Sequence, residues 1–246
     1  MGIATVITSG KGGVGKSTAA VGLGRALASR GRRVLLVDCD AGLRSLDRMT
    51  GTEENLVFDI SDVVFGRCSP AEAIYPCASC HGLFLLPAPA CGEDMVLPAV
   101  MRRLAPLLKS YYDHVLLDSP AGVDLGFRSA ACAADRALVL CSPDPVCVRS
   151  ADTVRRLLEQ LEILDKRLII NRFDGVFFDE TDFYSDLDGV IDSSGIQLFG
   201  LVPEDHRLAA AFLRGRPAPQ GSPGMMALSR IAARLDGESV PLPEKF

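Results

Sequence analysis

The chain has 246 residues, of which 48% are hydrophobic and 23% charged, a balance typical of a globular protein with a sizeable core. The formal net charge of −5 argues against a dedicated nucleic-acid-binding protein, which usually presents a basic face. No apolar run approaches the roughly 18–20 residues that a membrane span needs. The N-terminus shows no basic region and no cleavage site. We therefore expect a cytoplasmic protein whose eight cysteines are mostly reduced thiols.

Short apolar segments recur along the chain and alternate with segments of helical character. Segments that are apolar at consecutive positions are typical of strands buried on both faces. Such an alternation predicts βαβ units and an α/β fold, with a doubly wound, mainly parallel sheet flanked by helices. The predicted strands cover residues 4–7, 34–37, 83–86, 115–117, 137–140, 168–170 and 198–202.

The intervening segments predict helices and a single domain. Apolar residues spaced by three or four positions in 150–164 predict an amphipathic helix with Ser150 as its N-cap. Residues 216–224 are rich in proline and glycine and precede one last helix in 225–235, so we interpret them as a loop within the domain. We expect residues 1–237 to form this domain and residues 238–246 to be a short C-terminal tail.

A glycine-rich loop follows the first predicted strand and precedes a predicted helix over 17–30. Its sequence, GKGGVGKS in residues 10–17, fits the pattern G-x-x-x-x-G-K-[ST] of a phosphate-binding loop. Backbone N–H groups and the positive end of the helix would hold an anion there. Lys16 would contact the β- and γ-phosphates, and the Ser17 hydroxyl would bind Mg²⁺.

The same glycines also fit the dinucleotide fingerprint G-x-G-x-x-G, through Gly10, Gly12 and Gly15. Asp38, about 20 residues further on, has the place of a ribose-binding acid, so an NAD-dependent oxidoreductase is the competing interpretation. Lys16 and Ser17 argue against it, because a dinucleotide site needs neither residue. Asp118 follows another buried strand, from which a carboxylate can support Mg²⁺. We therefore favour a nucleoside triphosphate.

Four segments together resemble the MinD/ParA family of deviant P-loop ATPases, and within it the MinD branch. The resemblance covers the chain from Ile3 to about Asp236. It implies a Mg²⁺-dependent ATPase that dimerises around ATP and acts in division-site placement, or a related positioning task, through a protein partner. The segments are SGKGGVGKST, VDCDAGLRSLD, LLDSPAG and VPEDHRLAAAFLRGRP.

The resemblance also implies roles for individual residues. Lys11 is then the signature lysine, which reaches the phosphates of the partner subunit, and Asp40 orients the attacking water. Lys11, Lys16 and Asp40 are thus the catalytic candidates, and Ser17, Asp38 and Asp118 are the candidates for Mg²⁺. Ser45 stands where relatives often have asparagine. The nucleotide-binding candidates are Gly10, Lys11, Gly12, Gly13, Val14, Gly15, Lys16, Ser17 and Thr18 in the loop, and Asn171, Pro203, Glu204 and Asp205 for the base.

The cysteines allow another interpretation. Cys68, Cys77, Cys80, His81 and Cys91 lie within 24 residues of one another and include a C-x-x-C-H spacing that metal sites use. A haem attachment would need export, which we do not expect. Two interpretations are left for this segment: a zinc or iron–sulfur site, and a loop whose cysteines are free thiols. The remaining cysteines are expected to be small core residues; they are Cys39, Cys132, Cys141 and Cys147.

Two further functional classes remain as alternatives to the division-site switch. A ParA-like partitioning ATPase would bind DNA, which the acidic balance disfavours, and a metallocluster carrier depends on Cys77 and Cys80 alone. MinD proteins hold the membrane through a basic amphipathic C-terminal helix. Residues 236–246, DGESVPLPEKF, are not expected to form one, so membrane binding by the chain itself is uncertain and a protein partner is the expected link.

Overall fold

The structure is a computed structural model, and it describes residues 1–41, 44–90 and 97–242. Within these ranges the chain forms an eight-stranded sheet with the order β3-β4-β2-β5-β1-β6-β7-β8. The strands are β1 Ile3–Thr8, β2 Val34–Asp38, β3 Tyr75–Pro76, β4 Leu83–Leu86, β5 His114–Asp118, β6 Arg136–Cys141, β7 Lys166–Phe173 and β8 Leu198–Pro203.

All strand pairs are parallel except the pair of the edge strand β3 with β4. The seven apolar segments of the sequence are all strands here, which confirms the α/β fold with a mainly parallel sheet. The sequence pattern did not indicate β3, since two residues give no periodicity. The strand order reverses its direction at β1, which lies between β5 and β6. In parallel α/β sheets, ligands bind at the carboxyl ends of the strands beside such a reversal point.

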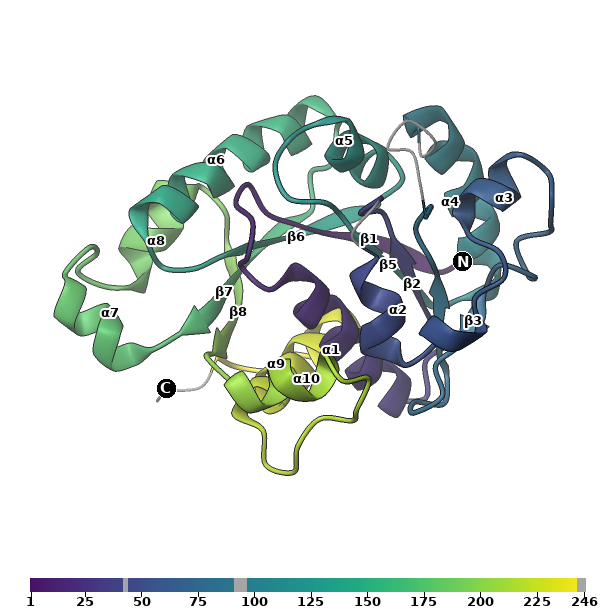
Figure 1. The fold of residues 1–246 in the computed structure, drawn as a ribbon. Coiled ribbons are helices and arrows are strands. Elements are labelled where there is room, and N and C mark those ends of the chain that lie inside the picture. Colours follow the sequence, from purple (N-terminus) through teal and green to yellow (C-terminus); the bar gives the residue numbers. More distant parts are fainter. Residues whose placement is uncertain (42–43, 91–96, 243–246) are drawn as a thin grey trace.

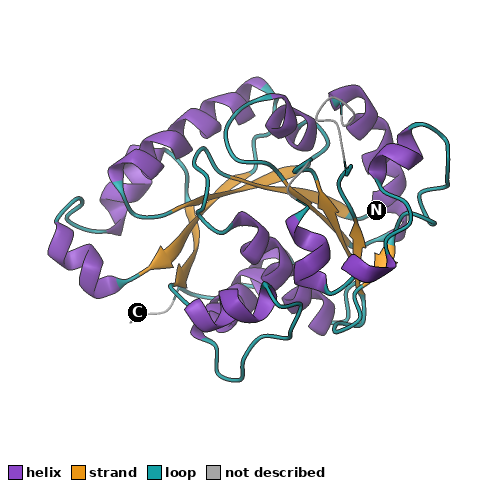
Figure 2. Ribbon diagram, in the orientation of Figure 1, coloured by secondary structure: helices purple, strands orange, loops and turns teal. Residues whose placement is uncertain are grey.

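Helices cover both faces of the sheet (Figures 1 and 2). Helices α1, α2, α9 and α10 lie on one face, and α4, α5, α6 and α8 lie on the other. A short 3₁₀ helix spans Glu53–Asn55. The helices are α1 Lys16–Ser29, α2 Ser45–Thr50, α3 Ile60–Val64, α4 Pro98–Tyr111, α5 Leu125–Ala131, α6 Pro145–Gln160, α7 Gly175–Thr181, α8 Leu187–Ser194, α9 His206–Phe212 and α10 Pro223–Leu235.

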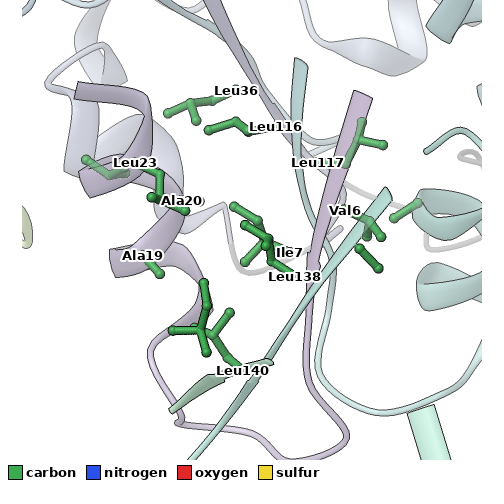
Figure 3. Close-up of a cluster of buried hydrophobic side chains, with 14 of the residues drawn as sticks. Val6, Ile7, Ala19, Ala20, Leu23, Leu36, Leu116, Leu117, Leu138 and Leu140 are labelled. Carbon is green, nitrogen blue, oxygen red and sulfur yellow. The ribbon is translucent and has the colours of Figure 1, made fainter. Parts of the chain in front are cut away.

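The central core lies between α1 and the sheet. Alternate strand residues such as Ile7, Leu116 and Leu138 face Ala20 and Leu23 of α1 (Figure 3), and all five are fully buried. Their neighbours along the strands, Val6 and Leu117 among them, face the opposite layer. Packing on both faces explains why these strands are apolar at consecutive positions, and it fixes α1 against the strand ends that carry the loop.

Helix α6 differs from the sequence-based prediction at both of its ends. Helix α6 begins at Pro145, because Asp144 caps it by accepting a hydrogen bond from the Cys147 N–H at 2.9 Å. Ser150 is therefore inside the helix, and its prediction as N-cap was wrong. The amphipathic stripe stops at the helix end, so Leu164 is exposed.

Helix α10 packs on α1 and on β8. Its Leu228, Ile231 and Leu235 are buried, as expected for a core helix. No helix in the described ranges is both long and apolar enough to cross a bilayer.

Candidate functional site: a phosphate-binding loop with two buried acids

The loop between β1 and α1 has the geometry of an anion cradle. Gly13 and Gly15 have positive φ angles of 78° and 90°, which residues with a side chain adopt only at a cost. A Cβ at Gly15 would also lie 2.6 Å from Nδ2 of Asn171, so a side chain here would displace the Asn171 amide as well as strain the backbone. Helix α1 then begins at Lys16 without a side-chain cap, which leaves its first N–H groups available to an anion.

Lys16 is buried at the start of α1, close to Asp118 and Asp40. Burial lowers the pKa of its ammonium group, although the two carboxylates act in the opposite direction. A cation held at this point by nearby acids and beside free backbone N–H groups is suited to a polyanion such as a triphosphate.

Asp38 and Asp118 occupy paired positions at the ends of β2 and β5, and each is only 1% exposed. Burial, together with the negative charge of Asp118, raises the pKa of Asp38 to about 8. Burial also raises the pKa of Asp118 to about 7, while the Ser17 hydroxyl and Lys16 act in the opposite direction. Two buried carboxylates this close together need a cation or protons to offset their charge.

The donor set fits Mg²⁺. Within the described part of the chain, Oδ1 of Asp118 is buried and has no hydrogen-bond partner, and the Ser17 hydroxyl donates to the same carboxylate. Mg²⁺ prefers oxygen ligands and usually binds through one or two carboxylates plus substrate phosphates. Ser17 and Asp118 are thus placed to hold it, directly or through water, with Asp38 beside them.

Described residues of the segment after β2 contact Asp38 and the phosphate-binding loop. Oδ1 of Asp38 accepts a hydrogen bond from the N–H of Asp40 at 3.0 Å, and Oδ2 accepts one from Leu46 at 3.4 Å. Ser45, the first residue of α2, donates to the Ser17 hydroxyl at 3.2 Å, which gives this serine a structural link to the candidate Mg²⁺ site. Gly42 and Leu43 of the same segment lie outside the described residues.

The residues predicted for the base also meet at one place. A cavity of about 220 Å³ is lined by Asn171 and by residues 203–205, together with Gly13, Gly15 and Thr18 of the loop. Nδ2 of Asn171 donates to the carbonyl of Val14 at 2.6 Å, so one side of its amide supports the loop. The carboxylate of Asp205 caps α9 and accepts from Ser222 at 2.6 Å, which gives it a structural role at the cavity wall.

Lys11 lines a second and more open cavity of about 460 Å³. Its Nζ lies 3.5 Å from Oδ1 of Asp144, and the two side chains are 46% and 30% exposed. Burial would raise the pKa of Asp144, but hydrogen bonds from Ser142 and the Cys147 N–H, with the charge of Lys11, lower it. The two lysines of the loop therefore occupy different environments.

Sequence reasoning missed Asp144 and Arg172. Arg172 adopts a left-handed conformation, with φ of 58°. Its guanidinium donates to the carbonyl of Gly13 at 3.3 Å and to Glu204 at 2.6 Å, so it lines both cavities and bridges the loop to the residue that follows β8. The Asp-Pro pair at 144–145 is a recognisable helix start, whereas no local signal marks Arg172.

The cysteine segment does not form a metal cage in the described residues. No group of three or more His, Cys, Asp or Glu side chains placed for one metal ion occurs there, and Cys91 lies outside these residues. The thiol of Cys77 instead donates to the carbonyl of Thr50 at 3.1 Å. Cys39, Cys141 and Cys147 are buried core residues as predicted, and Cys132 is partly buried.

The parallel sheet, the glycine loop before α1 and the two acids at neighbouring strand ends define a P-loop nucleotide-binding protein. The model of the CobQ/CobB/MinD/ParA nucleotide binding domain matches residues 5–218. The chain therefore belongs to this MinD/ParA family, and the resemblance read from its motifs is confirmed.

Individual relatives resemble the chain over almost its whole length. The septum site-determining protein MinD of Bacillus subtilis is 39% identical over 247 residues, which cover 98% of this chain and 92% of the relative. The MinD chain in the MinC:MinD cell division protein complex of Aquifex aeolicus has a TM-score of 0.90 at 35% identity, with 98% of each chain covered. MinD complexed with Mg-ADP from Pyrococcus horikoshii has a TM-score of 0.85 at 27% identity, with 96% of each covered.

Proposed function

We propose that this chain is a Mg²⁺-dependent ATPase of the MinD type, which forms a homodimer in its ATP-bound state and releases it on hydrolysis. Its task in this proposal is septum-site placement, exerted through a protein partner. We further propose a cytoplasmic location, with access to the inner face of the membrane through that partner. The observation that carries the proposal is the meeting of Lys16 and Ser17 with the buried carboxylates of Asp38 and Asp118.

The relatives support the ligand and the task. Curated relatives at 39% and 35% identity are septum site-determining MinD proteins, one similar structure holds Mg-ADP, and another is a complex with MinC. The ParA family ATPase from Chlorobium tepidum is similar at 22% identity with a TM-score of 0.79, which indicates a common fold only. The division-site task is therefore better supported than DNA partitioning.

The chemistry that this site would supply is mainly positioning and charge stabilisation, as for other phosphoryl transfers. The loop N–H groups and Lys16 would hold the phosphates, and Asp40 would orient the attacking water. Mg²⁺ would offset negative charge on the β- and γ-phosphates. The ammonium group of Lys11, which lines the open cavity, would reach the nucleotide of a second copy of the chain.

Phosphate release and sedimentation velocity, measured on the same samples with Mg²⁺ and either ATP or ADP, test this proposal. We expect the wild type to hydrolyse ATP slowly and to dimerise with ATP but not with ADP. Lys16→Ala should not bind ATP, and Asp40→Ala should remain a dimer because it does not hydrolyse the bound ATP. Wild-type turnover by Asp40→Ala would remove its assigned role. Co-sedimentation with liposomes and with duplex DNA separates the two tasks, and binding of the ATP-loaded protein to DNA alone would overturn the division-site assignment.

A further inference from the structure

The C-x-x-C segment forms the turn that joins β3 to β4. Across this hairpin the N–H of Cys77 donates to the carbonyl of Leu83 at 2.9 Å, and the N–H of Cys80 donates to the carbonyl of Cys77 at 3.3 Å. The second bond closes a β-turn, in which the first and fourth Cα atoms lie within about 7 Å of each other. This is about the separation that a disulfide bridges, and both thiols are free.

The two thiols differ in accessibility. Cys77 is buried, with 5% of its surface exposed, whereas Cys80 is partly exposed. A reagent in solution therefore meets Cys80 first, and Cys77 is placed behind it to resolve a mixed disulfide. The guanidinium of Arg25 is buried beside the turn and donates to the hydroxyl of Ser79 at 2.9 Å. Burial and the neighbouring Cys77 raise the pKa of the Cys80 thiol, and the positive charge of Arg25 opposes this only in part; the exposure of Cys80 and its place in the turn, and not an activated thiolate, make it the first site of attack.

The turn is attached to two helices that begin at the nucleotide site. Arg25 belongs to α1, which starts with Lys16 and Ser17 of the loop. The thiol of Cys77 donates to the carbonyl of Thr50, the last residue of α2. The first residue of the same helix, Ser45, donates to the Ser17 hydroxyl. A six-residue helix thus links the Cys77 thiol to the hydroxyl proposed to bind Mg²⁺.

We propose that Cys77 and Cys80 form a reversible disulfide, and that this modification weakens Mg²⁺ binding at the nucleotide site through α2. The effect on Mg²⁺ rests on the proposed function, whereas the disulfide itself does not.

The oxidant would be a low-molecular-weight disulfide. The Cys80 thiolate attacks one of its sulfurs, a bond forms between them, and one reagent thiol leaves. Cys77 then loses its proton to water and attacks the Cys80 sulfur, and the second reagent thiol leaves. Two protein thiols are thereby oxidised, and the reagent disulfide is reduced to two thiols. Because Cys77 has lost its S–H, the carbonyl of Thr50 loses its donor and α2 loses an attachment at its C-terminal end.

The test treats the full-length protein with oxidised glutathione and maps the products by mass spectrometry. We expect a loss of two hydrogens within the peptide that contains residues 77–80, reversed by dithiothreitol. Oxidation should raise the Mg²⁺ concentration for half-maximal ATP turnover about fivefold, as expected for the loss of one hydrogen bond. Cys77→Ser keeps a hydroxyl donor toward Thr50 but cannot form the disulfide, so its Mg²⁺ response should not change on treatment.

Cys80→Ser should behave like Cys77→Ser, and Cys68→Ser, which alters a partly buried cysteine outside the turn, should behave like the wild type. A glutathione adduct at Cys68 or Cys80 without any 77–80 disulfide would overturn the proposal. So would a 77–80 disulfide that leaves the Mg²⁺ response unchanged. The mass measurement does not depend on ATP turnover. Absence of turnover in the reduced protein would overturn the proposed function alone, and the mass of the 77–80 peptide would still decide the disulfide.

Discussion

Asp38 and Asp118 are direct neighbours across β2 and β5, so two buried carboxylates face the same end of the phosphate-binding loop. The sheet imposes this arrangement, because parallel strands in this register bring their carboxyl ends to a common edge. Without a cation, each carboxylate makes the charged form of the other less favourable. The fold therefore carries an electrostatic cost that Mg²⁺ with a nucleotide would relieve.

Replacement of one of these acids should separate stability from activity. We expect Asp118→Asn to raise the melting temperature in EDTA by about 2–4 °C, since about 1 kcal/mol of buried repulsion is removed. The same change should lower MgATP hydrolysis at least ~100-fold. Calorimetry and phosphate release check the two effects. Asp192→Asn, at an exposed position of α8, should change neither quantity. A lower melting temperature for Asp118→Asn in EDTA would contradict the electrostatic argument.

The side chain of Lys11 should matter for assembly and little for stability. Its ion pair with Asp144 is partly exposed and 3.5 Å long, so its loss should cost less than ~1 kcal/mol. We expect Lys11→Ala to bind ATP but to remain monomeric in sedimentation velocity runs with MgATP. Lys109→Ala is the matched control, because Lys109 pairs with Asp135 away from the loop. Unchanged ATP-dependent dimers in Lys11→Ala would exclude the role assigned to this lysine.

The positions of these groups could be predicted from the sequence to different extents. Consecutive apolar residues located the strands, and a strand end fixes where Asp38 or Asp118 must lie, so the acids and the loop followed from local patterns. The contacts of Lys11 did not follow, since Asp144 is 133 positions away. Arg172 was missed because its backbone conformation arises from a register irregularity between β7 and β8, which no residue type signals.

A pH effect on stability should come from the other end of the sheet. His114 is buried, and its Nε2 lies 3.1 Å from Oδ1 of Asp236. Burial lowers the pKa of His114 below its usual 6.5, although the bond to Asp236 opposes this. The folded state thus disfavours the protonated imidazole. The stability contributed by the neutral imidazole of His114 is complete above about pH 6.5 and is lost as the pH falls through the lowered pKa of the folded state.

Urea denaturation at pH 7.5, 6.5 and 5.5 measures this effect. We expect the free energy of unfolding of the wild type, measured relative to that of His114→Gln, to fall below pH 6.5 by at most about 1.4 kcal/mol per pH unit for one proton. His114→Gln keeps an N–H donor for Asp236 and cannot titrate, whereas Asp38 and Asp118, whose pKa values are raised, titrate in both proteins and cancel in the comparison. Parallel curves for the two proteins would show that His114 does not determine the slope.

Asn171 permits the sharpest test of how the base is recognised. One side of its amide supports Val14 of the loop, and the residue also lines the cavity formed with residues 203–205. If the amide also pairs with adenine, Asn171→Ala should weaken ATP binding by roughly tenfold and GTP binding by much less. Loss of loop support alone would weaken both nucleotides equally, because the phosphates are common to them. Titration calorimetry with the two Mg²⁺-nucleotides distinguishes these cases. Equal losses would confine Asn171 to the loop and leave the choice of base to residues 203–205.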